Sequence, residues 1–224
     1  MIEVRGVSHA YGERAVLRSV TVTLAEPRIA VIGANGSGKS TFARLLNGLV
    51  LPDEGDVTVH GLSTRSDGPA VRRLVGFVFT DPDAQIVMPT VAEDVAFSLR
   101  RHRLGREETQ RRVETALADV GLQDHADRPA HLLSGGQKQL LALCSVLVTE
   151  PRVLVCDEPT TLLDLPNSRR VLEMLAALPQ QVVHVTHDLD SLAGHDRVLV
   201  FDRGRIVADA APAQALDHYR YLVG

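Results

Sequence analysis

The chain has 224 residues, of which 45% are hydrophobic, and its formal net charge at pH 7 is −4. This length and composition suit a single α/β domain with a hydrophobic core and a smaller attached unit. No basic run alternates with aromatic residues and Trp is absent, so we expect no nucleic-acid partner.

The two cysteines, Cys144 and Cys156, lie in apolar stretches and are expected to pack as small hydrophobic residues. Neither a disulfide framework nor a zinc site is indicated, which favours a reducing cytoplasm. We expect no signal peptide, and the longest apolar run, Leu140 to Val148, is too short to span a bilayer. A chain of this kind that works at a membrane must dock onto a membrane-spanning partner.

Residues 1 to 28 alternate apolar and polar side chains, a pattern that predicts short strands. Tyr11 and Gly12 are expected in a turn between two of these strands. Tyr11 could cap the sheet, or it could present a platform on which a purine base stacks. Because a phosphate-binding motif follows, we favour the stacking role.

A glycine-rich loop follows the β-branched run Ile29 to Ile32, which predicts a buried strand. The loop fits the phosphate-binding pattern G-x-x-x-x-G-K-[ST] with Gly33, Ala34, Asn35, Gly36, Ser37, Gly38, Lys39 and Ser40, and Thr41 continues into a helix. Glycines let backbone N–H groups converge on an anion, and the helix adds the positive end of its dipole. Lys39 suits the β- and γ-phosphates and the Ser40 hydroxyl suits Mg²⁺. The structural alternative is an ordinary strand–turn–helix corner.

The chain then continues to alternate strands and helices. Residues 57–61 and 75–79 predict strands, with a short helix at 69–74 and a polar loop from Thr80 to Gln85. This alternation is typical of an α/β fold.

From about residue 86 to residue 150 the alternation is interrupted, and we interpret this stretch as an inserted helical subdomain. Thr90 and Glu93 form a capping-box pattern at the start of its first helix. A second helix at 106–120 is expected to end at Gly121. The core candidates of the first helix are Val91, Val95, Phe97 and Leu99.

A second glycine-containing helix start, Ser134-Gly135-Gly136-Gln137, lies near the end of this stretch. Ser134 is expected to cap a helix that runs to Val148. Two glycines at a helix start leave several N–H groups free, which predicts a second anion site, separate from the first. The alternative is a flexible helix cap.

An acidic pair, Asp157 and Glu158, ends the apolar strand predicted at Val153 to Cys156. Buried carboxylates are costly unless they are used, and α/β sheets place ligands at the carboxyl ends of their strands. We expect Asp157 to hold Mg²⁺, directly or through water, and Glu158 to accept a proton from an attacking water. The alternative is that both acids cap a helix.

The remaining elements are expected as a loop at 161–164, a helix at 168–178, a strand at 182–186, a hairpin at 198–208 and a helix at 212–224. His187 is singled out among nine histidines because it follows a strand on the ligand side of the sheet. His184 has apolar neighbours, so we assign it to the core.

Together these segments resemble the ATP-binding cassette (ABC) ATPases over nearly the whole chain. The motifs occur in the family's order: the phosphate loop Gly33–Ser40, the signature Leu133–Gln137, the pair Asp157-Glu158, the loop ending at Asp164, and His187. The guanine-reading NKxD motif of GTPases is absent. The resemblance implies one domain over residues 1–224 with a phosphate-loop NTPase fold of α/β class, an antiparallel β subdomain and a helical subdomain at about 86–150.

The resemblance also implies the mechanism of an ATPase. Two chains, expected to be identical, would dimerise head to tail, with ATP and Mg²⁺ held between one chain's phosphate loop and the other chain's signature residues. Glu158 would act as general base, His187 would orient the water and the γ-phosphate, and Lys39 would offset developing charge. Asp164 would also belong to the nucleotide site.

One position departs from the family's pattern. The family usually has Gln after the strand at 76–79, where it reaches Mg²⁺ and couples the site to the membrane partner, but this chain has Thr80. As a metal candidate Thr80 would act through a water, or Asp81 or Gln85 would take its place.

The stretch from Asp81 to Phe97 is similar to the ATPases of energy-coupling-factor importers. This resemblance implies a transmembrane coupling protein and a substrate-binding membrane subunit as partners, and a peripheral location at the cytoplasmic face of the membrane. Within that group the residues Phe79–Pro82 (FTDP) are most similar to the ATPase of biotin importers, and importers of cobalt, nickel or other vitamins are the alternative.

Two other classes stay open. A soluble ABC ATPase of translation or DNA repair usually carries two cassettes or a long coiled-coil insertion, and this sequence shows neither. A nucleotide-binding module without hydrolysis is disfavoured because Lys39, Asp157, Glu158 and His187 are all present.

Overall fold

The computed structural model describes residues 1–224. The strands are β1 (Ile2–Tyr11), β2 (Arg14–Leu24), β3 (Arg28–Gly33), β4 (Glu54–Val59), β5 (Leu62–Ser63), β6 (Val75–Val78), β7 (Val153–Asp157), β8 (Gln181–Val185), β9 (Arg197–Asp202) and β10 (Arg205–Ala210). The α-helices are α1 (Lys39–Leu46), α2 (Gly68–Leu74), α3 (Val91–Leu99), α4 (Arg106–Asp119), α5 (Gly135–Leu147), α6 (Leu165–Ala177) and α7 (Pro212–Val223). Short 3₁₀ helices are η1 (Pro82–Ala84), η2 (Arg100–His102), η3 (Gln123–His125), η4 (Ala130–Leu132) and η5 (Leu189–Gly194).

The strands form two sheets. The smaller sheet has the order β2-β1-β4-β5 and is antiparallel, and the larger has the order β10-β9-β3-β8-β7-β6. In the larger sheet the strands from β9 to β6 are parallel, and β10 alone runs antiparallel beside β9. This architecture confirms the predicted α/β fold with an antiparallel β portion.

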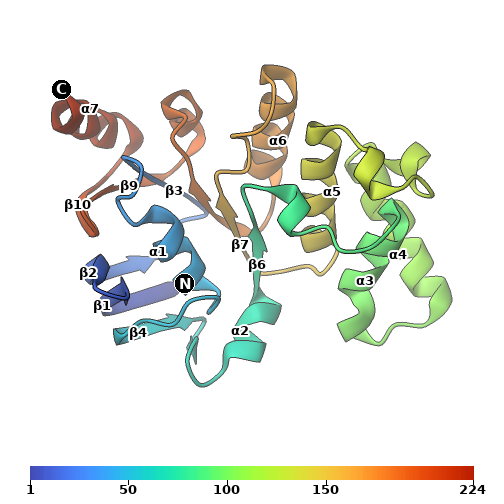
Figure 1. Ribbon diagram of the computed structural model, residues 1–224, viewed down its shortest axis with the longest axis horizontal. Coiled ribbons are helices and arrows are strands. Elements are labelled where there is room, and N and C mark those ends of the chain that lie inside the picture. The colour runs from blue at the N-terminus through green and yellow to red at the C-terminus, as the bar shows by residue number, and fades with distance from the viewer.

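Helix α1 lies between the two sheets (Figure 1) and joins them into one core. Its fully buried Phe42 packs against Phe201 of the larger sheet, with ring centroids 5.0 Å apart. The same cluster of buried side chains includes Ile2 and Val57 of the smaller sheet. Burial of this apolar surface is the main favourable contribution to the stability of the nucleotide-facing half of the fold.

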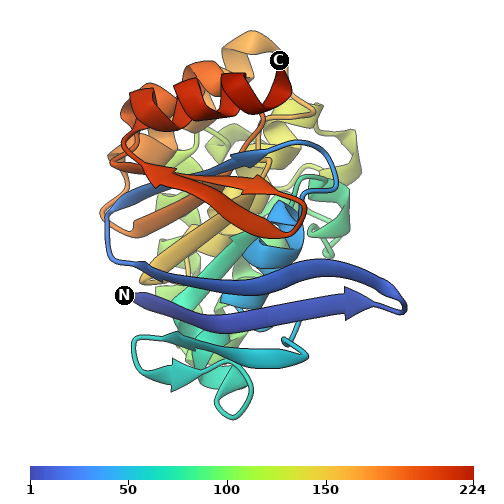
Figure 2. The ribbon, with the colours of Figure 1, turned by 90° about the vertical axis from the view of Figure 1, so that its left-hand side faces the viewer.

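The hairpin formed by β9 and β10 lies beside β2, as Figure 2 shows from the side. The turn of this hairpin reaches the phosphate loop, because Gly204 N donates to Ser37 O and Arg18 N donates to Gly204 O. The loop is therefore held from one side by both sheets.

Helices α3, α4 and α5 lie at the end of the larger sheet away from the antiparallel sheet (Figure 1). They share a second core cluster with sheet residues such as Val78 and Leu154. Three of the four core candidates of α3 are buried, but Phe97 is 41% exposed, so that prediction was wrong. Phe97 lies on the outer face of the helix, where Arg100 covers part of its ring. The division of residues 86–150 into a subdomain stays a prediction.

Two helix starts follow their capping residues. Thr90 and Glu93 form the predicted capping box of α3. Helix α6 begins at Leu165 and not at the expected Ser168, because Asp164 accepts a hydrogen bond from Asn167 N and a proline stands in the first turn.

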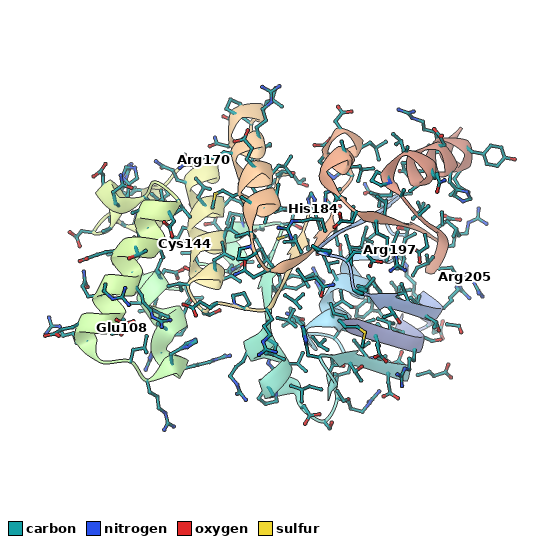
Figure 3. The ribbon with its side chains drawn as sticks, turned by 180° about the vertical axis from the view of Figure 1, so that it is seen from behind. Glu108, Cys144, Arg170, His184, Arg197 and Arg205 are labelled. Atoms are coloured by element: carbon teal, nitrogen blue, oxygen red, sulfur yellow. The ribbon has the colours of Figure 1, made fainter.

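The interior holds both cysteines and one histidine. Cys144 and Cys156 are free and buried, as predicted, and burial raises the pKa of the Cys144 thiol to about 12. His184 is 1% exposed, which agrees with its assignment to the core (Figure 3). Each helix is too short or too polar to span a bilayer.

Replacing Phe42 by Ala should lower the free energy of unfolding by about 3–5 kcal/mol, because the ring is fully buried between the sheets. Chemical denaturation monitored by circular dichroism measures this change. Phe97→Ala is the matched control, since its ring is exposed, and it should change the free energy by less than about 1 kcal/mol. Equal effects of the two substitutions would contradict this description of the core.

Candidate functional site

The phosphate loop turns sharply between β3 and α1, and two glycines make the turn possible. Gly33 has a φ of 147°, and a Cβ atom there would lie 2.2 Å from the carbonyl oxygen of Phe201. Gly38 has a φ of 107°, and its Cβ would lie 2.8 Å from the carbonyl oxygen of Val16. The loop is thus packed directly on neighbouring backbone, so only glycine fits at these positions.

A cavity of about 260 Å³ opens in front of this loop and the N-terminus of α1. It is lined by Tyr11, Arg14, Val16, Asn35, Gly36, Gly38, Lys39, Ser40, Thr41 and Glu158. The structure therefore brings Tyr11 and Glu158 to the phosphate loop, as the sequence analysis expected. Gly33, Ala34 and Ser37 belong to the loop without lining the cavity.

Two lining residues, Arg14 and Val16, were missed by the sequence analysis. They lie at the start of β2, where Arg14 is the register partner of Tyr11. The two residues follow Gly12 by two and four positions. Because alternate residues of a strand share one face, this spacing could have indicated that both lie on the side of Tyr11.

The Lys39 side chain is held against its own loop. Its ammonium group donates to Gly33 O at 2.8 Å and to Ala34 O at 3.0 Å. Burial lowers its pKa, while the negative charges of Glu158 and Asp157 oppose this shift. With three N–H donors, the group keeps one for a phosphate oxygen.

Ser40 and Asp157 form an oxygen pair beside the cavity. The Ser40 hydroxyl donates to Asp157 Oδ1 at 2.8 Å, and Arg44 Nη2 lies 3.8 Å from Asp157 Oδ2. Burial raises the pKa of Asp157, and the hydrogen bond from Ser40 and the charge of Arg44 counteract that rise. A hydroxyl and one carboxylate fit Mg²⁺, which is usually held by one or two carboxylates together with substrate phosphates. No group of three or more His, Cys, Asp or Glu residues forms a metal cluster.

Glu158 and His187 meet from two different segments of the chain. Glu158 Oε2 lies 3.2 Å from His187 Nδ1 and also accepts a hydrogen bond from Thr161 Oγ1 at 3.1 Å. Glu158 has a φ of 52°, in the left-handed region that is strained for a residue other than glycine. The contacts with His187 and Thr161 hold the carboxylate at the cavity wall through Oε2, and Oε1 is left without a protein partner.

The loop after β6 is held by main-chain contacts. The Thr80 hydroxyl donates to Asp157 O at 2.7 Å, so it positions the strand end that carries the carboxylate. The Gln85 amide accepts from Phe79 N and donates to Ala142 O, and Asp81 accepts from Asp83 N. A metal role for Thr80, or for Asp81 or Gln85 in its place, stays a prediction.

The second predicted anion site starts α5. Ser134 caps this helix as predicted: its Oγ accepts from Gln137 N, and Gln137 Oε1 accepts from Ser134 N. The Gln137 amide nitrogen also lies 3.0 Å from His125 Nε2, so both polar ends of this side chain are in contact with groups of the same chain. Ser134 and Gly135 are exposed at the helix start and do not line the phosphate-loop cavity.

Asp164 lies with this second site and not with the first. Asn167 Nδ2 donates to Asp164 Oδ1 at 2.7 Å, and a Cβ at Gly136 would lie 2.5 Å from the Asn167 side chain. Asp164 and the signature segment are thus joined through Asn167. The two predicted anion sites thus lie apart in this chain, one at α1 and one at α5.

Comparisons with known proteins agree with this geometry. A family model described as "ABC transporter" matches residues 17–161. An ABC transporter ATP-binding protein of Deinococcus radiodurans is 56% identical over 98% of this chain and 97% of the relative. The biotin transport ATP-binding protein BioM of Rhizobium etli is 49% identical over 98% of this chain and 97% of its own. The structure of cbiO1 from Clostridium perfringens, described as part of the ABC transporter complex cbiONQ, has a TM-score of 0.86 at 30% identity and covers 99% of this chain and 92% of that one.

Replacing Gly38 by Ala should lower the free energy of unfolding by about 2–4 kcal/mol and weaken nucleotide binding, because the new Cβ meets the Val16 carbonyl at an unfavourable φ. Thermal denaturation with and without ATP measures both effects. Gly105→Ala is the control, since Gly105 has open space and a φ of −65°; as the N-cap of α4 it should cost no more than about 1 kcal/mol. A Gly38 variant as stable as the control would contradict the close packing of the loop.

Proposed function

The chain belongs to the ABC transporter family and is an ATP-binding ATPase, and we propose that it powers an importer of the energy-coupling-factor type that takes up biotin. The observation that carries the proposal is the separation of the two anion sites within one chain. Lys39, Ser40 and Glu158 line one cavity, whereas Ser134 and Gly135 start a helix outside it.

The two segments offer complementary groups. The phosphate loop supplies Lys39 and the amides at the start of α1 inside the cavity, and α5 begins with exposed N–H groups outside it. Two identical chains arranged head to tail would place the second site of one chain over the first site of the other. Such an arrangement closes into a dimer with two equivalent nucleotide sites.

The phosphate loop, Lys39 and Tyr11 would bind ATP in the cavity, with the base on Tyr11 and the phosphates at the amides of α1. Ser40 and Asp157 would hold Mg²⁺, which supplies positive charge to the phosphates.

Glu158 would act as the general base through Oε1, the oxygen that no protein group occupies. His187 contacts the other oxygen of Glu158 at 3.2 Å and would orient the attacking water and the γ-phosphate. Stabilisation of developing charge is the largest contribution in reactions of this type, and the loop amides and the partner's signature would provide it.

The membrane partner is proposed from the loop between Thr80 and Gln85 and from α3, whose sequence is similar to energy-coupling-factor ATPases. The chain would bind a transmembrane coupling protein at the cytoplasmic face, and a separate membrane subunit would bind the cargo. Biotin as cargo is supported by the resemblance to BioM, and the resemblance to a cobalt import ATP-binding protein, CbiO, supports a cobalt importer as the second candidate.

The partners can be tested by a tagged pull-down from detergent-solubilised native membranes, followed by mass spectrometry. The proposal expects one transmembrane coupling protein and one compact membrane subunit, with no second ATPase. Uptake of labelled biotin, compared with uptake of cobalt or nickel ions by the same cells, then identifies the cargo. Co-purification of ribosomes or repair factors without membrane proteins would contradict the importer.

Replacing Glu158 by Gln should lower the hydrolysis rate at least about a hundredfold, because the general base is lost. ATP binding should persist, so the variant should accumulate as an ATP-bound dimer. Analytical ultracentrifugation at saturating ATP measures the dimer, and Glu114→Gln, an exposed position on α4, is the control. A Glu158 variant that stays monomeric at saturating ATP would argue against the proposed catalytic dimer.

A further inference from the structure

The nucleotide cavity contains a second cation besides Lys39. The ammonium group of Lys39 is already bonded to two loop carbonyls, at 2.8 and 3.0 Å. Arg14 also lines the cavity, and its guanidinium has no hydrogen-bond or ion-pair partner within the chain. An arginine that faces a phosphate-binding cavity without a partner is free to bind an anion.

The backbone under Arg14 is fixed against the phosphate loop. Arg14 begins β2 opposite Tyr11, and Val16, at a register shift two residues further on, lines the same cavity. The carbonyl of Val16 is in such close contact with Gly38 that no side chain fits there. The strand therefore cannot move away from the loop without breaking this contact.

The guanidinium of Arg14 lies close to the phosphate loop. A methyl group built on Gly36 would lie 3.5 Å from Arg14 Nη2, so the cation reaches the loop apex. Tyr11, the register partner of Arg14 on the neighbouring strand, lines the same cavity. Glu158 is the one carboxylate in the cavity lining, and it already contacts His187 and Thr161.

We propose that Arg14 binds the phosphate chain of ATP and ADP on the side nearer the base, and so adds affinity for nucleotides beyond that of the phosphate loop. The planar guanidinium donates two parallel hydrogen bonds to phosphate oxygens, which Lys39 cannot do. The contact belongs to phosphates that ATP and ADP share. This inference rests on the proposed function, since it takes the cavity to be the nucleotide site.

Isothermal titration calorimetry on the full chain with Mg²⁺ tests the inference. The probes are the imido analogue of ATP, ADP and adenosine, at low and at high ionic strength. Arg14→Gln should raise the dissociation constants of both nucleotides by a similar factor of about ten and leave adenosine binding unchanged. Arg14→Lys keeps the positive charge but loses the two parallel donors of the guanidinium, and it should raise the dissociation constants about threefold. High salt should shrink these differences because it screens the exposed cation.

Arg73→Gln is the matched control, because Arg73 is an exposed arginine on α2 outside the cavity. Arg14 and Arg73 are both exposed, so the substitutions should leave folding unaffected, and circular dichroism checks this. Unchanged nucleotide affinity in Arg14→Gln, an effect on the ATP analogue alone, or an equal loss for adenosine would each overturn the inference. An effect only on dimerisation would overturn it too, since the cation would then contact a second chain.

Failure of the proposed function gives a different pattern. If the wild-type chain bound no adenine nucleotide, the cavity would not be a nucleotide site. If nucleotides bound, Lys39→Ala weakened them and Arg14→Gln did not, the nucleotide site would stand and Arg14 alone would lose its role.

Discussion

The hydrogen bond from Ser40 to Asp157 is the contact on which the nucleotide half of the structure depends. It joins the start of α1 to the end of β7, two elements more than a hundred residues apart in the chain. Asp157 is 2% exposed, and burial raises its pKa, so its carboxylate is costly in the absence of a cation. This unfavourable burial occurs beside the cavity, where bound Mg²⁺ and nucleotide would stabilise the charged carboxylate. Functional sites often hold such locally unfavourable groups.

The parallel sheet explains why the other proposed catalytic groups lie near this contact. β3, β8 and β7 are neighbours in the sheet, and the phosphate loop, His187 and Glu158 follow their carboxyl ends. Their register pairs Val31 and Asp157 with the same residue of β8, Val185. The sheet thus brings the segments that carry the proposed catalytic groups to one edge, where Glu158 and His187 are in contact. The signature segment starts α5 and does not line the phosphate-loop cavity. In the proposed dimer, the signature segment of a second chain would reach that cavity.

Features set by local sequence could be predicted, and those set by tertiary contacts could not. The caps at Thr90 and Ser134 depend on residues within the first turn of each helix, so the sequence revealed them. Phe97 was misplaced because which face of α3 is buried depends on how the helix packs on its neighbours. The positions of Thr80 and Gln85 depend on the main chain of Asp157 and Ala142, far away in sequence. Arg14 was not predicted to line the cavity because its place there depends on how β2 packs against the phosphate loop.

If the phosphate loop of one chain works with the signature segment of another, mixing two inactive variants should restore activity. Lys39→Ala disables the first site and Ser134→Arg disables the second. In a head-to-tail dimer, a mixed pair keeps one complete site, formed by the intact loop of one variant and the intact signature of the other. An equimolar mixture should regain about a quarter of the wild-type ATPase rate, because about half of the dimers are mixed and each has one intact site of two. A mixture that stays as inactive as either variant alone would contradict the account.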